Sequence, residues 1–119
     1  MLISKQITVK EIQEEFSALF NGLKIEFYHS GHTSKVGSTN QDKIDADTSL
    51  HQIKPDIVSG DIVLNAKSTV AQFEEEMKSR FGLNVQVFRK SNELYLQTIT
   101  TDNWTLETQN TKGLNSTSK

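Results

Sequence analysis

The 119-residue sequence predicts an α+β fold, a two-layer sandwich in which two helices cover one face of a four- or five-stranded sheet. Two observations support this. A strand-helix-strand pattern occurs twice along the chain, and a short polar loop with a further strand follows its second occurrence. Right-handed β-α-β crossovers place both helices on the same face of a sheet, which leaves the other face without helices.

The first unit begins with residues 2–7, whose loose alternation predicts a strand. Thr8 and Glu11 then form the T-x-x-E pattern of a capping box, which predicts a helix that begins at this point. Asn21-Gly22 ends the helix because glycine adopts positive φ at little cost, and residues 23–28 alternate as a strand. The helix carries one apolar stripe: Val9, Ile12, Phe16, Leu19 and Phe20.

The second unit repeats this order, with a short strand at residues 62–64, a capping box at Thr69 and Gln72, and Gly82 at the helix end. Its apolar stripe and following strand comprise Val70, Phe73, Met77, Phe81, Leu83, Val85 and Val87. The matches to the first helix share one offset of 61 residues, which predicts an internal repeat. The alternative is that any two amphipathic helix-strand pairs look partly alike.

A hairpin is expected after the second unit, with Ser91-Asn92 as its loop. Pairing Lys90 with Glu93 would place Phe88 opposite Tyr95. Residues 1–100 are then a single domain with a long polar connection at 30–59, and residues 101–119 form a short helical turn and a flexible tail.

This order of elements is similar to the ferredoxin-like architecture, which by itself implies no function. Its open sheet face would carry three aromatic residues, Tyr28, Phe88 and Tyr95, beside Gln86 and Gln97. Such a face contacts another protein or a second copy of the chain, is covered by the C-terminal segment with Trp104, or stacks single-stranded nucleic acid. We expect a protein partner, with a homodimer as one form of the interaction.

Charge and composition narrow the partners. The chain has 13 basic and 15 acidic residues and a net charge of −2, so nucleic acid is not the expected partner. It has no cysteine and no apolar run of about 20 residues, which predicts a cytoplasmic protein without a membrane contact.

A second functional hypothesis places a ligand or metal site in the connection 29–51, at His29, His32 and His51. Imidazole suits first-row metals, but H-x-x-H outside a helix has no fixed geometry. No G-x-S-x-G elbow is present, and GHTSKVGST lacks the lysine position of a phosphate loop. We therefore predict a non-enzymatic interaction module with no cofactor.

Overall fold

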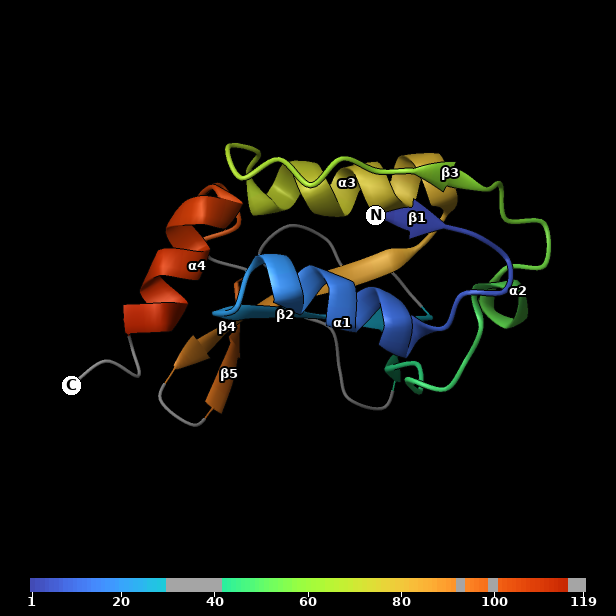
Figure 1. Ribbon diagram of the computed structural model, residues 1–119, viewed down its shortest axis with the longest axis horizontal. Helices are drawn as coiled ribbons and strands as arrows, with labels where there is room; N and C mark the ends of the chain where they lie inside the picture. Colours follow the sequence, from blue (N-terminus) through green and yellow to red (C-terminus); the bar gives the residue numbers. More distant parts are fainter. Residues whose placement is uncertain (30–41, 92–93, 99–100, 116–119) are drawn as a thin grey trace.

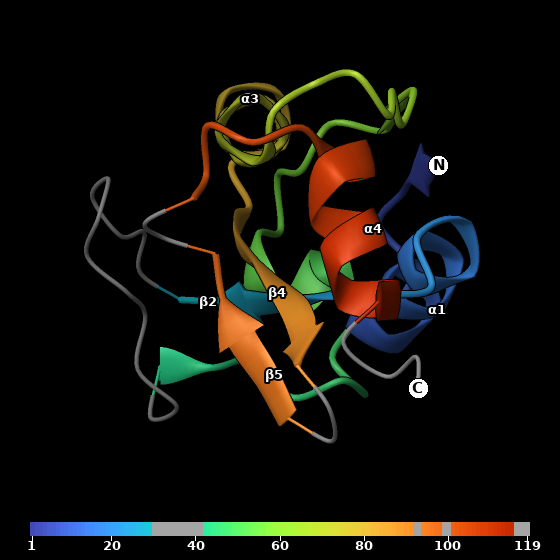
Figure 2. The ribbon, with the colours of Figure 1, turned by 90° about the vertical axis from the view of Figure 1, so that its left-hand side faces the viewer.

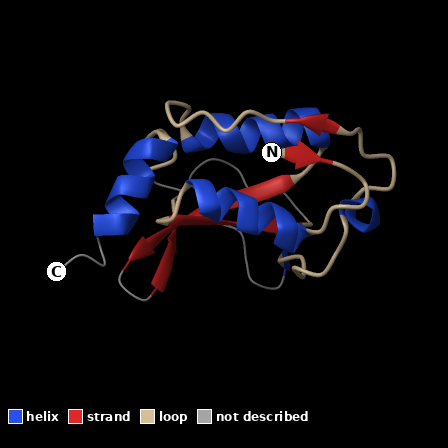
Figure 3. Cartoon of the chain, viewed as in Figure 1, coloured by secondary structure: helices blue, strands red, loops and turns tan. Residues whose placement is uncertain are grey.

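The computed structural model describes residues 1–29, 42–91, 94–98 and 101–115, and forms a compact α+β domain with two antiparallel sheets and four helices (Figures 1 and 3). None of its helices, within these ranges, is long and apolar enough to cross a bilayer. In chain order the elements are β1 (Leu2–Ile3), α1 (Val9–Leu19), β2 (Leu23–Tyr28), α2 (Leu50–Ile53), β3 (Gly60–Asp61), α3 (Val70–Phe81), β4 (Asn84–Ser91), β5 (Leu94–Gln97) and α4 (Leu106–Asn115).

The strands divide into a three-stranded sheet of order β2-β4-β5 and a two-stranded sheet of β1 and β3. The predicted single sheet of four or five strands is therefore not present in the described residues. The outer edge of β2 is already occupied by other groups, which explains why β1 does not extend the larger sheet. These groups are Gln13 Nε2, which donates to the Ile25 carbonyl at 2.8 Å, Ser17 Oγ to Leu23 at 3.0 Å, and the Ile44 N–H to Phe27 at 2.8 Å.

Both predicted capping boxes are present. Thr8 with Glu11 begins α1, and Thr69 with Gln72 begins α3, each pair exchanging side-chain and backbone hydrogen bonds. Gly82 ends α3 with φ 68°, as its position predicts.

Gly22 acts differently from the prediction, because Phe20 ends α1 and Gly82 is the one glycine with positive φ among the described residues. A Cβ at Gly22 would lie 2.6 Å from the Asn110 carbonyl oxygen, and one at Gly113 would lie 2.3 Å from the Gly22 carbonyl oxygen. The two glycines allow α4 to approach the start of β2 closely.

The C-terminal segment is more ordered than the predicted short turn. Residues 106–115 form a ten-residue helix, α4, which packs against β4 and β2 with Leu106, Gln109 and Gly113 buried (Figure 2). Residues 116–119, the rest of the expected flexible tail, lie outside the described range.

The same hydrogen-bond arrangement joins the starts of two helices in each half of the chain, α1 and α2 in the first half and α3 and α4 in the second. In the first half the bonds are Val9 N–H to Thr48, Lys10 N–H to Ala46, Leu50 N–H to Ile7 and His51 N–H to Lys5. In the second half they are Val70 N–H to Trp104, Ala71 N–H to Asp102, Leu106 N–H to Ser68 and Glu107 N–H to Ala66. In each half, N–H groups at the start of each helix thus donate to carbonyl groups in the segment that precedes the other helix.

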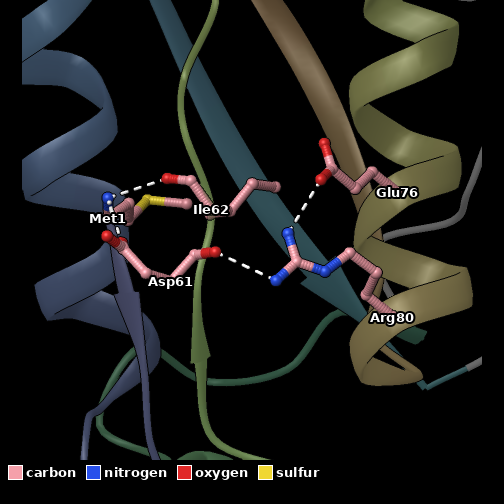
Figure 4. Close-up of polar contacts among 5 residues, drawn as sticks. All are labelled: Met1, Asp61, Ile62, Glu76 and Arg80. Atoms are coloured by element: carbon pink, nitrogen blue, oxygen red, sulfur yellow. Dashed lines mark hydrogen bonds and ion pairs between the residues drawn. The ribbon is translucent and has the colours of Figure 1, made fainter.

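The smaller sheet is held to α3 by polar contacts (Figure 4). Arg80 donates to the Asp61 carbonyl at 3.0 Å and to the Glu76 carboxylate at 2.8 Å, while the Met1 amino group contacts Asp61 Oδ1 at 2.9 Å. β3 lies two residues before the predicted strand at 62–64, although the Ile62 N–H still donates to Met1. Val63 is exposed and lies outside the pairing of β1 with β3.

The β4–β5 hairpin differs from the prediction by two residues in register. Ser91 pairs with Leu94 and Phe88 with Gln97, so Lys90 rather than Phe88 lies opposite Tyr95. An apolar pattern of period 2 cannot separate these registers, because a shift of two residues keeps every side chain on its face.

Candidate functional site

The sheet face without helices carries a cation-aromatic cluster where β2, β4 and β5 lie side by side. Lys24 pairs with Phe88 across β2 and β4, and its ammonium group lies 5.4 Å from the Phe88 ring centroid and 4.6 Å from that of Tyr95. The Glu26 carboxylate forms an ion pair with the same ammonium group at 3.3 Å. The lysine is therefore held over both rings and does not extend freely into solvent.

Exposure divides the predicted interaction face into two parts. Tyr28 and Gln86 are buried, with 2% and 0% of their surface exposed, although they lie on the predicted face. Tyr95 is 38% exposed, and Phe88 and Gln97 are partly buried. Of the five predicted residues, only those near the β4–β5 end are thus available for contact, and whether they form an interface stays a prediction.

The buried part of this face has polar atoms without partners. Among the described residues, neither the Tyr28 hydroxyl nor Gln86 Oε1 has a hydrogen-bond partner. Burial, followed by the Glu26 and Asp42 carboxylates, raises the pKa of Tyr28 to about 12. The tyrosine therefore stays neutral at physiological pH and supplies no charge to the face.

Strand β5 adds two exposed residues that were not predicted from the sequence. Leu94 and Leu96 are 69% and 44% exposed, and they flank Tyr95 on the opposite side of the strand. The sequence signal for these exposed residues was the run of three large apolar residues without polar alternation. We call Lys24, Phe88, Leu94, Tyr95 and Leu96 the β5 surface.

A shallow groove of about 300 Å³ with polar and apolar lining groups adjoins the β5 surface. Within it, Gln13 Nε2 donates to Glu26 Oε1 at 2.9 Å and so fixes the carboxylate beside Lys24. Lysine and glutamate side chains both line the groove, so it carries charges of both signs. Such a lining suits the amide and charged groups of a peptide better than it suits a ligand with one strong charge. Its lining residues are Lys10, Gln13, Glu14, Ser17, Lys24, Ile25, Glu26 and Tyr95.

Glu74 is a second polar feature that the sequence did not reveal. It lies on α3, and its carboxylate accepts the Val87 N–H of β4 at 2.9 Å and Gln86 Nε2 at 3.4 Å. Burial raises the pKa of Glu74, the Val87 hydrogen bond lowers it and the Asp102 carboxylate raises it, which together give a pKa of about 8. Within the run Glu74-Glu75-Glu76, no residue type distinguished this carboxylate from its exposed neighbour Glu75.

Trp104 does not cover the aromatic cluster. Its ring lies 5.6 Å from the Arg89 guanidinium, and Arg89 Nη1 donates to Gln109 on α4 at 3.1 Å. Arg89 pairs with Leu23 on the face that the helices cover. The C-terminal segment therefore packs on the opposite side of the sheet from Phe88 and Tyr95.

The predicted metal residues are partly described. His29 is exposed, its N–H donates to the Asp42 carbonyl at 3.0 Å, and its carbonyl accepts from Asn84 at 3.3 Å. His51 is exposed on α2, while His32 lies outside the described residues. Within the described ranges, no three histidine or carboxylate side chains gather as a metal would require. A site in the connection 29–51 stays a prediction.

No protein-family model, curated protein or solved structure matches the chain.

Proposed function

We propose that the chain is a non-enzymatic protein-interaction module whose contact surface is the β5 surface. The observation that carries this proposal is the run Leu94, Tyr95 and Leu96 on the edge strand, where each side chain is at least 38% exposed. Consecutive exposed apolar residues on a sheet edge are costly in solution and favour contact with another protein. Tyrosine also contributes strongly to protein interfaces.

Charge supports a protein partner over single-stranded nucleic acid. Lys24, whose ammonium group lies 4.6 Å from the Tyr95 ring centroid, is already paired with Glu26. Arg89 faces α4 and Trp104 on the other side of the sheet. Nucleic-acid binding would require cations that neutralise phosphates along the stacked bases, and these two side chains are engaged elsewhere.

We also infer that the chain is an internal repeat of two halves. The repeated capping boxes and the matched sets of backbone hydrogen bonds support this inference. The halves differ after their second strand, where only the second half has the described hairpin partner β5. The β5 surface therefore belongs to the part of the second half that has no described counterpart in the first half.

The double variant Phe88→Asp/Tyr95→Asp tests the proposal. Two carboxylates on the β5 surface should abolish self-association or partner capture, measured by sedimentation velocity and by pull-down with tagged protein, while circular dichroism stays unchanged.

Val58→Asp/Val63→Asp is the matched control, because it adds the same charge at side chains that are 68% and 81% exposed elsewhere. If sedimentation and pull-down are the same for both double variants and the unmodified protein, the β5 surface is not the contact surface. Should Phe88→Asp disturb folding, Leu94→Asp/Tyr95→Asp makes the same test with exposed side chains only.

A further inference from the structure

The backbone of β5 has one side turned away from the rest of its sheet. The Lys90 N–H donates to Gly22 at 2.9 Å, toward β2, and the Thr98 N–H donates to Val87 at 3.2 Å. Because the Lys90 N–H points toward β2, it cannot bond to β5. Lys90 and Tyr95 are therefore a non-hydrogen-bonded pair of the antiparallel β4–β5 ladder. The N–H and C=O groups of Tyr95 therefore point outward from β4.

Within the described part of the chain, no strand lies beyond β5, and no backbone hydrogen bond reaches Tyr95 from outside the sheet. The strand also lacks the usual protection of an edge, because its four residues, LYLQ, include no charge and no proline. Outward backbone groups beside exposed apolar side chains are the features through which a sheet accepts another strand.

We propose that β5 pairs in antiparallel orientation with β5 of a second copy of this chain, about a two-fold axis at Tyr95. This inference rests on the proposed function and specifies its partner. The Tyr95 N–H of each copy donates to the Tyr95 carbonyl of the other. Leu94 then lies opposite Leu96 of the second copy on one face, and the two tyrosines meet on the other face. The two three-stranded sheets become one continuous sheet of six strands.

Charge favours this edge over the other surfaces for a second copy. The exposed side of α1 carries Lys10 beside Glu14 and Glu15, and that of α3 carries Lys78 and Arg80 beside Glu75, so a contact through either helix would bury charged groups. β5 has no charged residue, and the nearby Lys24 is neutralised by Glu26. A contact through β5 between two copies therefore buries no charged residue of this strand.

The small contact sets the strength of the dimer. A four-residue strand contributes far less than the roughly 20–30 residues per partner of a standard stable interface. We therefore expect a reversible dimer with a dissociation constant on the order of 0.1 mM, rather than an obligate one.

Single-cysteine cross-linking tests the register, and the chain contains no cysteine that would interfere. Directly opposed residues at the axis have Cα atoms about 5.5 Å apart, within reach of a disulfide. Tyr95→Cys should form a covalent dimer under mild oxidation roughly ten-fold faster than Val63→Cys, whose position is 81% exposed but far from β5. Gln97→Cys is the register control, because its two copies would be about 13 Å apart in this pairing.

An equimolar mixture of Leu94→Cys and Leu96→Cys keeps Tyr95 and should give the mixed disulfide in preference to either homodimer. The pairing is overturned if Tyr95→Cys cross-links no faster than Val63→Cys and the mixed disulfide is not enriched. Under that outcome, partner capture that is still lost in Phe88→Asp/Tyr95→Asp would leave the proposed function standing with a different protein as partner. Capture that is unchanged would remove both.

Discussion

At the scale of single residues, Glu74 shows how one side chain can take the place of a strand carbonyl as hydrogen-bond acceptor. The Val87 N–H points toward the β5 side of β4, where a regular ladder would continue through Thr98. Glu74 accepts this N–H instead, and the described strand β5 ends at Gln97. The carboxylate thus replaces a strand partner, at the cost of burying an ionisable group.

The raised pKa of Glu74 makes stability depend on pH. In the folded protein this pKa is about 8, against 4.5 for the unperturbed group. The folded state therefore keeps a proton that the unfolded chain releases between these values, and the contribution of Glu74 to the free energy of unfolding falls as pH rises through that window.

Glu74→Gln should remove this dependence, because glutamine still accepts the Val87 N–H but cannot ionise. We expect the variant to be more stable than the unmodified protein at pH 8.5 by on the order of 2 kcal/mol, with a much smaller gain at pH 5. Urea unfolding at both pH values measures the difference. Glu75→Gln removes an exposed charge one residue away and serves as control. Equal pH dependence for Glu74→Gln and the unmodified protein would contradict the role of Glu74.

At the scale of elements, the helix starts could be predicted from sequence, because a capping box is a local pattern whose partners are three residues apart. The role of Gly22 could not be predicted in this way. Its constraint comes from Gly113, which lies in α4 and is distant along the chain. The position of Gly22 directly after the apolar stripe predicted helix termination, since positive φ is the local use of glycine.

The approach of α4 to β2 predicts a specific cost at Gly113. Gly113→Ala should destabilise the protein by about 1–3 kcal/mol, because the new Cβ would lie 2.3 Å from the Gly22 carbonyl oxygen. Intrinsic helix propensity alone predicts the opposite sign. Lys112→Ala, at the exposed neighbouring position, should change stability little. Thermal or urea unfolding compares the two variants, and a Gly113→Ala protein as stable as Lys112→Ala would show that α4 does not pack at this distance.

At the scale of the whole molecule, periodicity identified the apolar faces but not how the strands divide between sheets. Ile25 and Phe27 alternate as predicted, yet the carbonyls of their strand are taken by Gln13 and Ile44. No sequence pattern indicates that groups outside the sheet will donate to the carbonyls of an edge strand in this way. Likewise, alternation placed Tyr28 with Tyr95 on one face, but burial separates them, since exposure depends on what packs over each residue.

The β5 surface follows from this whole-molecule arrangement. Helices α1, α3 and α4 pack on β2 and β4, while the exposed residues of β5 lie at the end of the three-stranded sheet (Figure 2). The most direct test is the amide spectrum of isotopically labelled protein, recorded from about 20 μM to about 1 mM. We expect concentration-dependent shifts at residues 94–97 and at their β4 partners, and none in Tyr95→Asp. Spectra that do not change with concentration, or shifts centred on α1 and α3, would contradict self-association through the β5 surface.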